Sequence, residues 1–150
     1  MAKKVSKDTP LSEITLRRYE KPYDGAGSKR ELVRKLCLSL GLLQPGDSRD
    51  VIVDILHVLL QSRKEMQELN SEEIRERAIM LRKKESLALQ GIASSNIRRQ
   101  LKRLRDILIV EKIKNRYRIS EFGKLEDAFQ SRIEQYLLPS VISRIKEYLR

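Results

Sequence analysis

The residues best suited to chemistry gather in one stretch of the chain, residues 91–120. This stretch carries nine basic and two acidic side chains, a net charge of +7, whereas the whole chain of 150 residues carries +11. Clustered lysines and arginines together create a positive electrostatic potential, which attracts polyanions more strongly than one charge does. The stretch also has the pattern of a polar turn, a helix and a two-stranded ribbon, so the charge is predicted to lie on folded elements.

A basic helix is predicted over residues 94–107. Its apolar residues recur at i, i+4, i+7 and i+11, which places them within about 40° of one direction on a helix. These residues are Ile97, Leu101, Leu104 and Leu108. The opposite side carries polar and charged residues, namely Ser95, Arg99, Lys102, Arg103 and Asp106, with Asn96 and Arg98 on the flanks. The apolar stripe is therefore expected to hold the helix on the core while a row of cations faces outward.

Residues 108–119 predict a β-hairpin. The start, Leu108-Ile109-Val110, has strand composition, and the apolar residues that follow alternate with basic ones. Lys114-Asn115 is the expected turn, because asparagine tolerates the positive φ that a tight hairpin requires. The hairpin would carry four further cations, Lys112, Lys114, Arg116 and Arg118.

The sequence gives little support for catalytic or metal-binding chemistry. The single cysteine, Cys37, lies in an apolar helical pattern, which favours burial over reactivity. The single histidine, His57, lies between two apolar residues and is expected to pack or to cap a polar neighbour rather than to act as a base. These two residues cannot form a disulfide or a four-ligand zinc site. We therefore expect no cofactor and no enzymatic activity.

Outside residues 91–120, the sequence predicts an N-terminal arm and several helices. Residues 1–27 have the composition of a basic N-terminal arm. Ser28 and Glu31 form a capping-box pattern that opens a helix ending near Gly41. Asp47 or Ser48 is expected to cap a broad apolar helix that runs to about Lys64.

A third helix should begin at a second capping box, Asn70 with Glu73. The sequence does not decide whether it ends near Lys84 or extends toward Leu89. Its basic residues interleave with glutamates, as on an ordinary ion-paired and solvated surface. These residues are Arg75, Arg77, Arg82, Lys83 and Lys84.

Two helices are predicted after Gly123. Pro139 is expected to break the first, and Ser140 to begin the second. Residues 121–150 have no net charge but carry apolar stripes. These stripes would either complete the core or form a dimer contact, and the sequence leaves the choice open. The candidate contact residues are Phe129, Ile133, Tyr136, Leu137, Ile142 and Ile145.

The order of helix, helix, basic helix and β-ribbon resembles the winged helix-turn-helix domain over roughly residues 48–123. The string Ser94-Ser95-Asn96-Ile97-Arg98-Arg99-Gln100-Leu101-Lys102-Arg103-Leu104 and the close Tyr117-Arg118-Ile119-Ser120-Glu121-Phe122-Gly123 are its most specific parts. The whole chain, including Leu-Arg-Arg-Tyr-Glu-Lys-Pro at 16–22, also looks like a group of small predicted archaeal transcriptional regulators. Two departures are Ile107, where the family usually has glycine, and a long stretch from about Lys83 to Ile92.

The resemblance implies a mainly α fold with a small β-hairpin, in which a winged helix-turn-helix core gains extra N-terminal and C-terminal helices. It divides the chain into the arm at 1–27, a DNA-binding domain at 28–123 and a helical extension at 124–150. Its implied activity is regulation of transcription through duplex DNA, with helix 94–107 in the major groove and the wing 108–119 on the backbone or minor groove. The implied DNA contacts are Ser94, Ser95, Asn96, Arg98, Arg99, Lys102, Arg103, Lys112, Lys114, Arg116 and Arg118.

Two other functions remain open. Winged helices also serve as protein-contact subunits of transcription or chromosome-organising assemblies, and the same charge would suit structured RNA. No stretch approaches the ~18 apolar residues of a membrane span, so we expect a cytoplasmic, nucleoid-associated protein without a membrane partner. The sequence does not indicate a small-molecule effector or an operator.

Overall fold

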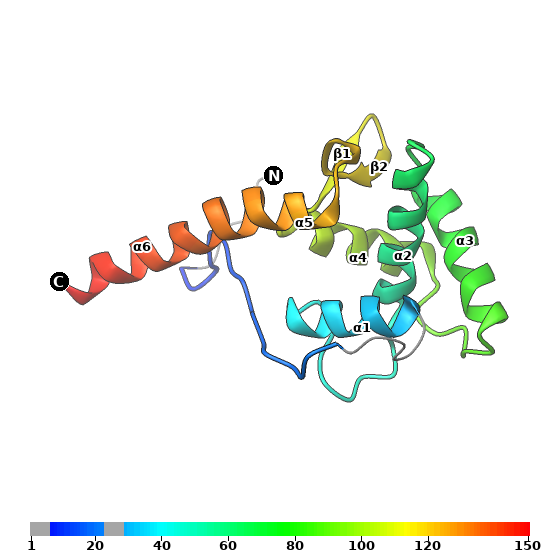
Figure 1. Ribbon diagram of the computed structural model, residues 1–150, viewed down its shortest axis with the longest axis horizontal. Helices are drawn as coiled ribbons and strands as arrows, with labels where there is room; N and C mark the ends of the chain where they lie inside the picture. The colour runs from blue at the N-terminus through cyan, green and yellow to red at the C-terminus, as the bar shows by residue number, and fades with distance from the viewer. Residues whose placement is uncertain (1–6, 23–28) are drawn as a thin grey trace.

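The computed structural model describes residues 7–22 and 29–150. The described chain is mainly helical with one small antiparallel sheet, as predicted (Figure 1). Its elements follow in this order: α1 (Lys29–Ser39), α2 (Val51–Lys64), α3 (Ser71–Lys84), α4 (Ser94–Asp106), β1 (Val110–Ile113), β2 (Arg116–Ile119), η1 (Ser120–Phe122), α5 (Leu125–Ala128), η2 (Phe129–Leu137) and α6 (Leu138–Leu149). No helix within these residues is long and apolar enough to cross a lipid bilayer.

Helix α2 lies at the centre of the core. It is buried on nearly all sides, and it packs against α1, α3, α4 and β2. This burial explains its apolar composition, since a helix with neighbours all around has no face for solvent. The broad apolar face predicted for this helix is confirmed: Val51, Ile52, Ile55, Val58 and Leu59 are all buried.

Helix α1 ends at Ser39, two residues before Gly41 and so close to the predicted end. Gly41 has a φ of 70°, and the backbone N–H groups of Gly41 and Leu42 donate to the carbonyls of Leu38 and Cys37. Glycine suits this position for conformational reasons and also for steric ones, because a Cβ at residue 41 would lie 2.5 Å from the Cβ of Thr15. The capping residue expected at the other end, Ser28, lies outside the described residues.

The described part of the N-terminal arm is docked on α1. The guanidinium of Arg17 donates to the carbonyls of Leu38 and Leu43 and to the side chain of Gln44, while its backbone N–H donates to Ser39. The last carbonyls of a helix have no partner within it, so Arg17 supplies some of the missing donors at the end of α1.

Helix α3 begins where the sequence predicted, and the structure decides its other end, which the sequence left open. The backbone N–H of Glu73 donates to Asn70 Oδ1 at 2.8 Å, and the backbone N–H of Asn70 donates to Glu73 Oε1 at 3.1 Å, which completes the predicted capping box. The helix ends at Lys84, the shorter of the two predicted ends.

The hairpin forms as predicted around a two-residue turn. Lys114 and Asn115 have φ values of 50° and 63°, which matches the twist of a tight hairpin. Val110 pairs with Ile119 at the base of the ladder, and Ile113 pairs with Arg116 at its tip. Leu69 adds an isolated bridge to the free edge of β2, where it exchanges two backbone hydrogen bonds with Tyr117.

The N-terminus of α2 differs from the prediction. Neither Asp47 nor Ser48 caps this helix; the capping position belongs to Asp50, and its side chain makes no capping bond. The Asp50 carboxylate instead accepts hydrogen bonds from Arg30 at 3.0 Å and Arg82 at 2.9 Å. Two guanidinium donors are stronger partners for a carboxylate than backbone N–H groups, so ion pairing prevails over capping here.

A buried ion network joins α1, α2 and α3. Asp54, with no exposed surface, accepts from Arg30 at 3.1 Å and from Arg82 at 2.7 Å. The expectation that Arg82 belongs to a solvated surface is therefore wrong: Arg82 is 2% exposed and also donates to the Ala88 carbonyl. The helical spacing of basic and acidic residues on α3 hid this role, because the partners of Arg82 lie on α2.

The C-terminal residues form one long helix rather than two. Leu137 and Leu138 keep right-handed helical backbone angles, so Pro139 does not break the helix, contrary to prediction. The preceding segment, η2, is a π-helix, and its wider turns relieve the clash and the missing hydrogen bond that proline causes in a regular α-helix. Figure 1 shows this helix leaving the body as a rod that ends at the C-terminus.

Candidate nucleic-acid interface

Helix α4 presents a basic outer face. Ile97, Leu101 and Leu104 have no exposed surface and hold the opposite side of α4 on the core, as predicted. The fourth residue of the predicted stripe, Leu108, instead lies beyond the end of α4, has a φ of 68° and is only half-buried. The exposed side chains of the outer face include Ser95, Arg98, Arg99 and Lys102. Among the described residues, Arg98 and Arg99 have no acidic partner, whereas Lys102 pairs with Asp106 at 3.0 Å. The two unpaired guanidiniums are therefore available to an anion.

Other residues predicted to contact DNA are engaged within the protein. The Asn96 side chain donates to the Gly91 carbonyl at 2.7 Å and accepts from Gln100 at 3.1 Å, so both ends of its amide are occupied. Arg103 donates to Gln100 Oε1 and to the Gly41 carbonyl. The Ser94 hydroxyl donates to Glu72 of α3 at 2.6 Å. These three residues position α4 against its neighbours.

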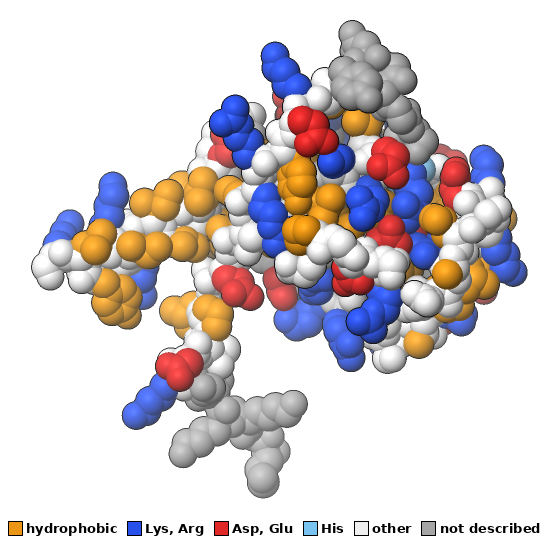
Figure 2. Space-filling view, turned by 90° about the horizontal axis from the view of Figure 1, so that it is seen from below, with side chains coloured by type: hydrophobic (Ala, Val, Ile, Leu, Met, Phe, Trp, Pro, Cys, Tyr) orange, Lys and Arg blue, Asp and Glu red, His pale blue; other side chains and the backbone are white. Residues whose placement is uncertain are grey.

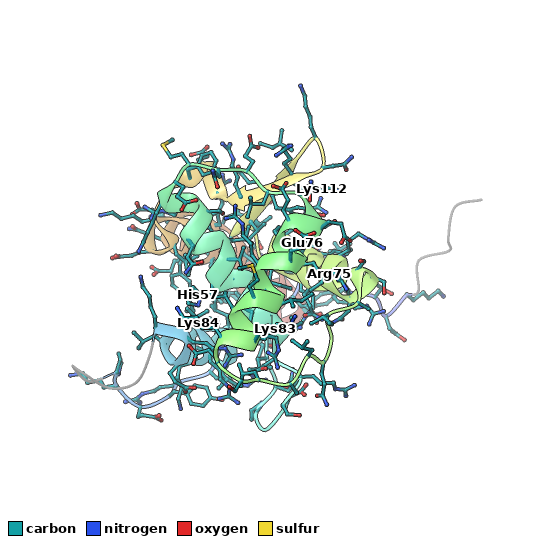
Figure 3. All side chains as sticks on the ribbon, turned by 90° about the vertical axis from the view of Figure 1, so that its right-hand side faces the viewer. His57, Arg75, Glu76, Lys83, Lys84 and Lys112 are labelled. Atoms are coloured by element: carbon teal, nitrogen blue, oxygen red, sulfur yellow. The ribbon has the colours of Figure 1, made fainter. Side chains whose placement is uncertain are left out.

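The four cations of the hairpin fall into two groups: two are exposed lysines, and two are arginines with acidic partners. Lys112 and Lys114 are exposed, and Lys114 lies in the turn at the tip, where a long side chain reaches furthest from the body. Figure 3 shows Lys112 at the hairpin, above α3. Arg116 and Arg118 have acidic partners in the protein, Glu73 at 3.8 Å and Glu111 at 2.9 Å respectively.

The carboxylate of Glu111 neutralises part of the positive charge of the hairpin. It accepts hydrogen bonds from Arg118, from the Ser120 hydroxyl and from the backbone N–H of Glu121. Burial acts to raise the pKa of Glu111, but these hydrogen bonds outweigh it and lower the pKa below its ordinary value. Glu111 is therefore ionised at neutral pH and compensates the charge of Arg118.

The basic residues of α3 lie in different environments. Figure 3 shows Arg75, Glu76, Lys83 and Lys84 on this helix, with His57 of α2 nearby. Lys83 and Lys84 are exposed, in agreement with the predicted solvated surface. Arg75 is half-buried and donates to the Ile92 carbonyl at 2.6 Å, so it fastens the loop that leads into α4. Arg75 and Arg82 together anchor the long stretch between α3 and α4.

Arg49 is not among the DNA contacts that the sequence predicts. The structure places it in the loop between α1 and α2, across a pocket from Ser95, Arg99 and Arg103 of α4. Its sequence neighbourhood, a Pro-Gly-Asp-Ser turn, offers no sign of this position. Only the packing of α1 and α2 brings the loop beside α4.

The structure offers no support for thiol or metal chemistry. Burial raises the pKa of the Cys37 thiol to about 12, so the reactive thiolate is absent at neutral pH. Burial and the nearby charge of Lys29 lower the pKa of His57, so its imidazole ring is neutral at neutral pH. Within the described residues, no group of three or more histidine, cysteine, aspartate or glutamate side chains is arranged to hold a metal ion.

The candidate dimer residues also fall into two groups. Ile133 and Leu137 are buried in the core of the same chain, and Phe129 packs against that core. Tyr136, Ile142 and Ile145 are exposed. Figure 2 shows hydrophobic side chains in a row along the projecting helix. The exposed apolar surface therefore lies near the end of the rod.

Comparison of the chain with protein-family models, with curated proteins and with solved structures found no match.

Proposed function

We propose that this protein binds duplex DNA as a sequence-specific transcriptional regulator of the winged helix-turn-helix type. In this proposal α4 enters the major groove, and the β1–β2 hairpin lies on the adjacent backbone or minor groove. The observation that carries the proposal is the outer face of α4, where Arg98 and Arg99 are exposed without acidic partners among the described residues. An arginine at this position suits the O6 and N7 acceptors of guanine, which it binds bidentately.

The topology supports the same proposal. Leu69 lies between α2 and α3, and its N–H and carbonyl both bond Tyr117 of β2 at 3.1 and 2.7 Å. These two hydrogen bonds tie the hairpin to the link between α2 and α3, which would help to position it for a DNA contact beside α4.

The wing would supply contacts that do not depend on sequence. Lys112 and Lys114 are exposed at the hairpin, and a flexible ammonium group suits a phosphate better than a base edge. Arg116 and Arg118, which already have acidic partners, would add less. Binding of this kind would place the protein on the nucleoid.

The test is selection of bound sequences from a random duplex library at physiological salt, followed by titration of the selected duplex. Neutralising about five phosphates should give a log–log salt slope of about −4 to −5. Enrichment of one motif, and weaker binding to an unselected duplex, would support sequence-specific recognition. Absence of binding at ~50 mM salt, where electrostatic attraction is strong, would refute the proposal.

We further propose that the protein acts as a homodimer through α6. No residue of α6 is buried within the described chain, although residues 138, 141, 145 and 148 are apolar and follow the spacing of paired helices. This end of the long C-terminal helix therefore lacks the packed apolar face from which helices in proteins draw most of their stability. Residues 121–150 have no net charge, so two copies would meet there without the repulsion expected elsewhere on a chain of +11.

Sedimentation at micromolar concentrations tests the dimer. The full chain should sediment as a dimer, and a chain ending at Leu137 should be monomeric but folded, because α6 contributes no buried residue to the described core. A dimer would also bind a two-fold site more tightly than a half-site, and truncation should remove this advantage. A full-length monomer whose state does not change on adding DNA would contradict the dimer.

The exposed face of α6 also favours a second candidate function, contact with a different protein. That function does not need the unpaired arginines on the outer face of α4. It would become the better account if the full chain were monomeric and bound neither duplex DNA nor structured RNA. Binding of structured RNA in preference to duplex DNA at equal salt would instead support the RNA-binding alternative.

A further inference from the structure

A pocket lies between the α1–α2 loop and the first turns of α4. It has a volume of about 420 Å³. Its floor is formed by buried apolar side chains of the loop and of α2, which are Leu42, Leu43, Val51 and Ile52. Its rim is polar and includes Gln44, Asp47, Arg49, Ser95, Arg99, Gln100 and Arg103. The pocket is therefore open on the side where α4 presents its basic face.

The rim carries an excess of positive charge. Arg49 from the loop and Arg99 from α4 are exposed, and neither has an acidic partner among the described residues. Within the described part of the chain, Arg103 donates to two neutral groups, the side chain of Gln100 and the carbonyl of Gly41, and no carboxylate neutralises its charge. The one carboxylate of the rim, Asp47, accepts from the backbone N–H of Arg49 at 2.9 Å.

A chain of side-chain hydrogen bonds holds the α4 wall of the pocket in place. Asn96 binds the Gly91 carbonyl, Gln100 binds Asn96, and Arg103 binds Gln100 and then Gly41. Gly91 has a φ of 75°, and a Cβ there would lie 3.0 Å from the Asn96 amide nitrogen. A guanidinium held in this way loses little conformational entropy when it binds an anion.

The α1–α2 loop, which lines the pocket, and the hairpin lie on opposite sides of α4. In Figure 1 the loop is below this helix, and β1 and β2 are above it. A helix in the major groove lies between the two phosphate backbones that border the groove. Elements on opposite sides of such a helix therefore face different DNA strands.

We propose that this pocket binds a backbone phosphate of duplex DNA, with Arg49 and Arg103 as its ligands, on the strand that the hairpin does not contact. The guanidinium group is suited to this role because it binds phosphate oxygens through two parallel N–H donors. The proposal rests on the proposed DNA-binding function and extends it: the α1–α2 loop becomes a second backbone contact, and Arg49 becomes a binding residue. A free phosphate or a small phosphorylated compound shares the same chemistry.

The experiment measures the binding of a labelled mixed-sequence duplex by the full-length chain over a series of salt concentrations. Arg49→Ala should lower affinity roughly fivefold and flatten the log–log salt slope by about one unit. Arg49→Lys should keep the slope, since the charge remains, but lose affinity because the bidentate contact is lost. Lys83→Ala is the matched control: it removes one exposed charge on α3 and should leave the slope unchanged. Arg49 is exposed, so its variants should fold like the parent.

The outcomes separate the two proposals. If the parent protein binds duplex DNA and Arg49→Ala behaves like Lys83→Ala, the phosphate site is refuted while DNA binding stands. If the parent does not bind duplex DNA, both fail. A second measurement titrates inorganic phosphate by calorimetry. Phosphate binding that Arg49→Ala abolishes, together with an unchanged salt slope on DNA, would assign the pocket to a free anion and overturn the proposal.

Discussion

Arginines serve opposite purposes in two regions of this molecule. Between α1, α2 and α3, the buried Arg82 and the partly buried Arg30 bind the carboxylates of Asp50 and Asp54 at 2.7 to 3.3 Å. On the outer face of α4, Arg98 and Arg99 are exposed and have no acidic partner among the described residues. The residue type and the helical context are the same, and only the neighbours differ.

The difference shows what each cluster can do. A buried charge that loses its partner leaves the other charge uncompensated in a medium of low polarity, so the buried cluster controls stability. An exposed, unpaired charge is solvated and adds little to stability, but its field reaches an approaching polyanion. Substitutions in the two regions should therefore affect different properties, and four predictions test this separation.

Arg82→Ala should have the largest effect. It leaves Asp54 buried with one guanidinium partner instead of two, and the Ala88 carbonyl without its donor. We expect a loss of roughly 3–5 kcal/mol in the free energy of unfolding, measured by urea denaturation. Lys84→Ala, two residues away on the exposed side of α3, should change it by less than about 0.5 kcal/mol. Equal effects of the two substitutions would mean that the network does not stabilise the fold.

Arg99→Ala should affect binding and leave stability nearly unchanged. We expect a loss of about 1–3 kcal/mol in the free energy of binding to a selected duplex, with a smaller loss on random duplex. The free energy of unfolding should change by less than about 0.5 kcal/mol. A stability loss comparable with that of Arg82→Ala would show that the two regions are not separate.

Acid should weaken the buried cluster. Burial acts to raise the pKa of Asp50, but the hydrogen bonds from Arg82 and Arg30 outweigh it and lower the pKa. A lowered pKa in the folded state gives stability that is fully present above the ordinary value of about 3.9 and is lost as the pH falls below it. The urea midpoint should therefore be steady near neutral pH and fall below about pH 4. Asp50→Asn should show a shallower fall, and identical profiles would contradict the assignment.

Lys114→Ala should have the smallest effect. Lys114 lies at the exposed tip of the hairpin, so its removal should weaken binding to selected and random duplexes alike. The log–log salt slope should flatten by about one unit, with no loss of discrimination between sequences. Discrimination that falls along with affinity would indicate that the hairpin reads bases as well as phosphates.

Local signals were sufficient for several elements. The capping box of Asn70 and Glu73 and the turn at Lys114-Asn115 involve residues within three positions of each other, so their hydrogen bonds and backbone angles follow from neighbouring residues. The continuous C-terminal helix was not predicted, because the π-helical turns that accommodate Pro139 depend on the path of the whole segment.

The sequence predicted where along the chain the candidate site lies, but not which of its side chains are engaged within the protein. Its charge and the outward face of α4 follow from the spacing of residues 94–107. The engagement of Asn96 by Gly91 and of Arg103 by Gly41, 62 residues away, does not follow from that spacing. Arg49 joins the basic face only because α1 and α2 bring its loop beside α4.

The sequence by itself therefore determined the helices before Gly123, the hairpin and the place where positive charge accumulates, because these depend on periodicity and on short-range hydrogen bonds. The tertiary structure alone decided which arginines are free. Arg82 and Arg99 lie on helices of similar basic character, but Arg82 meets Asp50 and Asp54 across the core, and Arg99 meets solvent. Ion pairing between distant segments depends on how helices pack, and no local pattern encodes that packing.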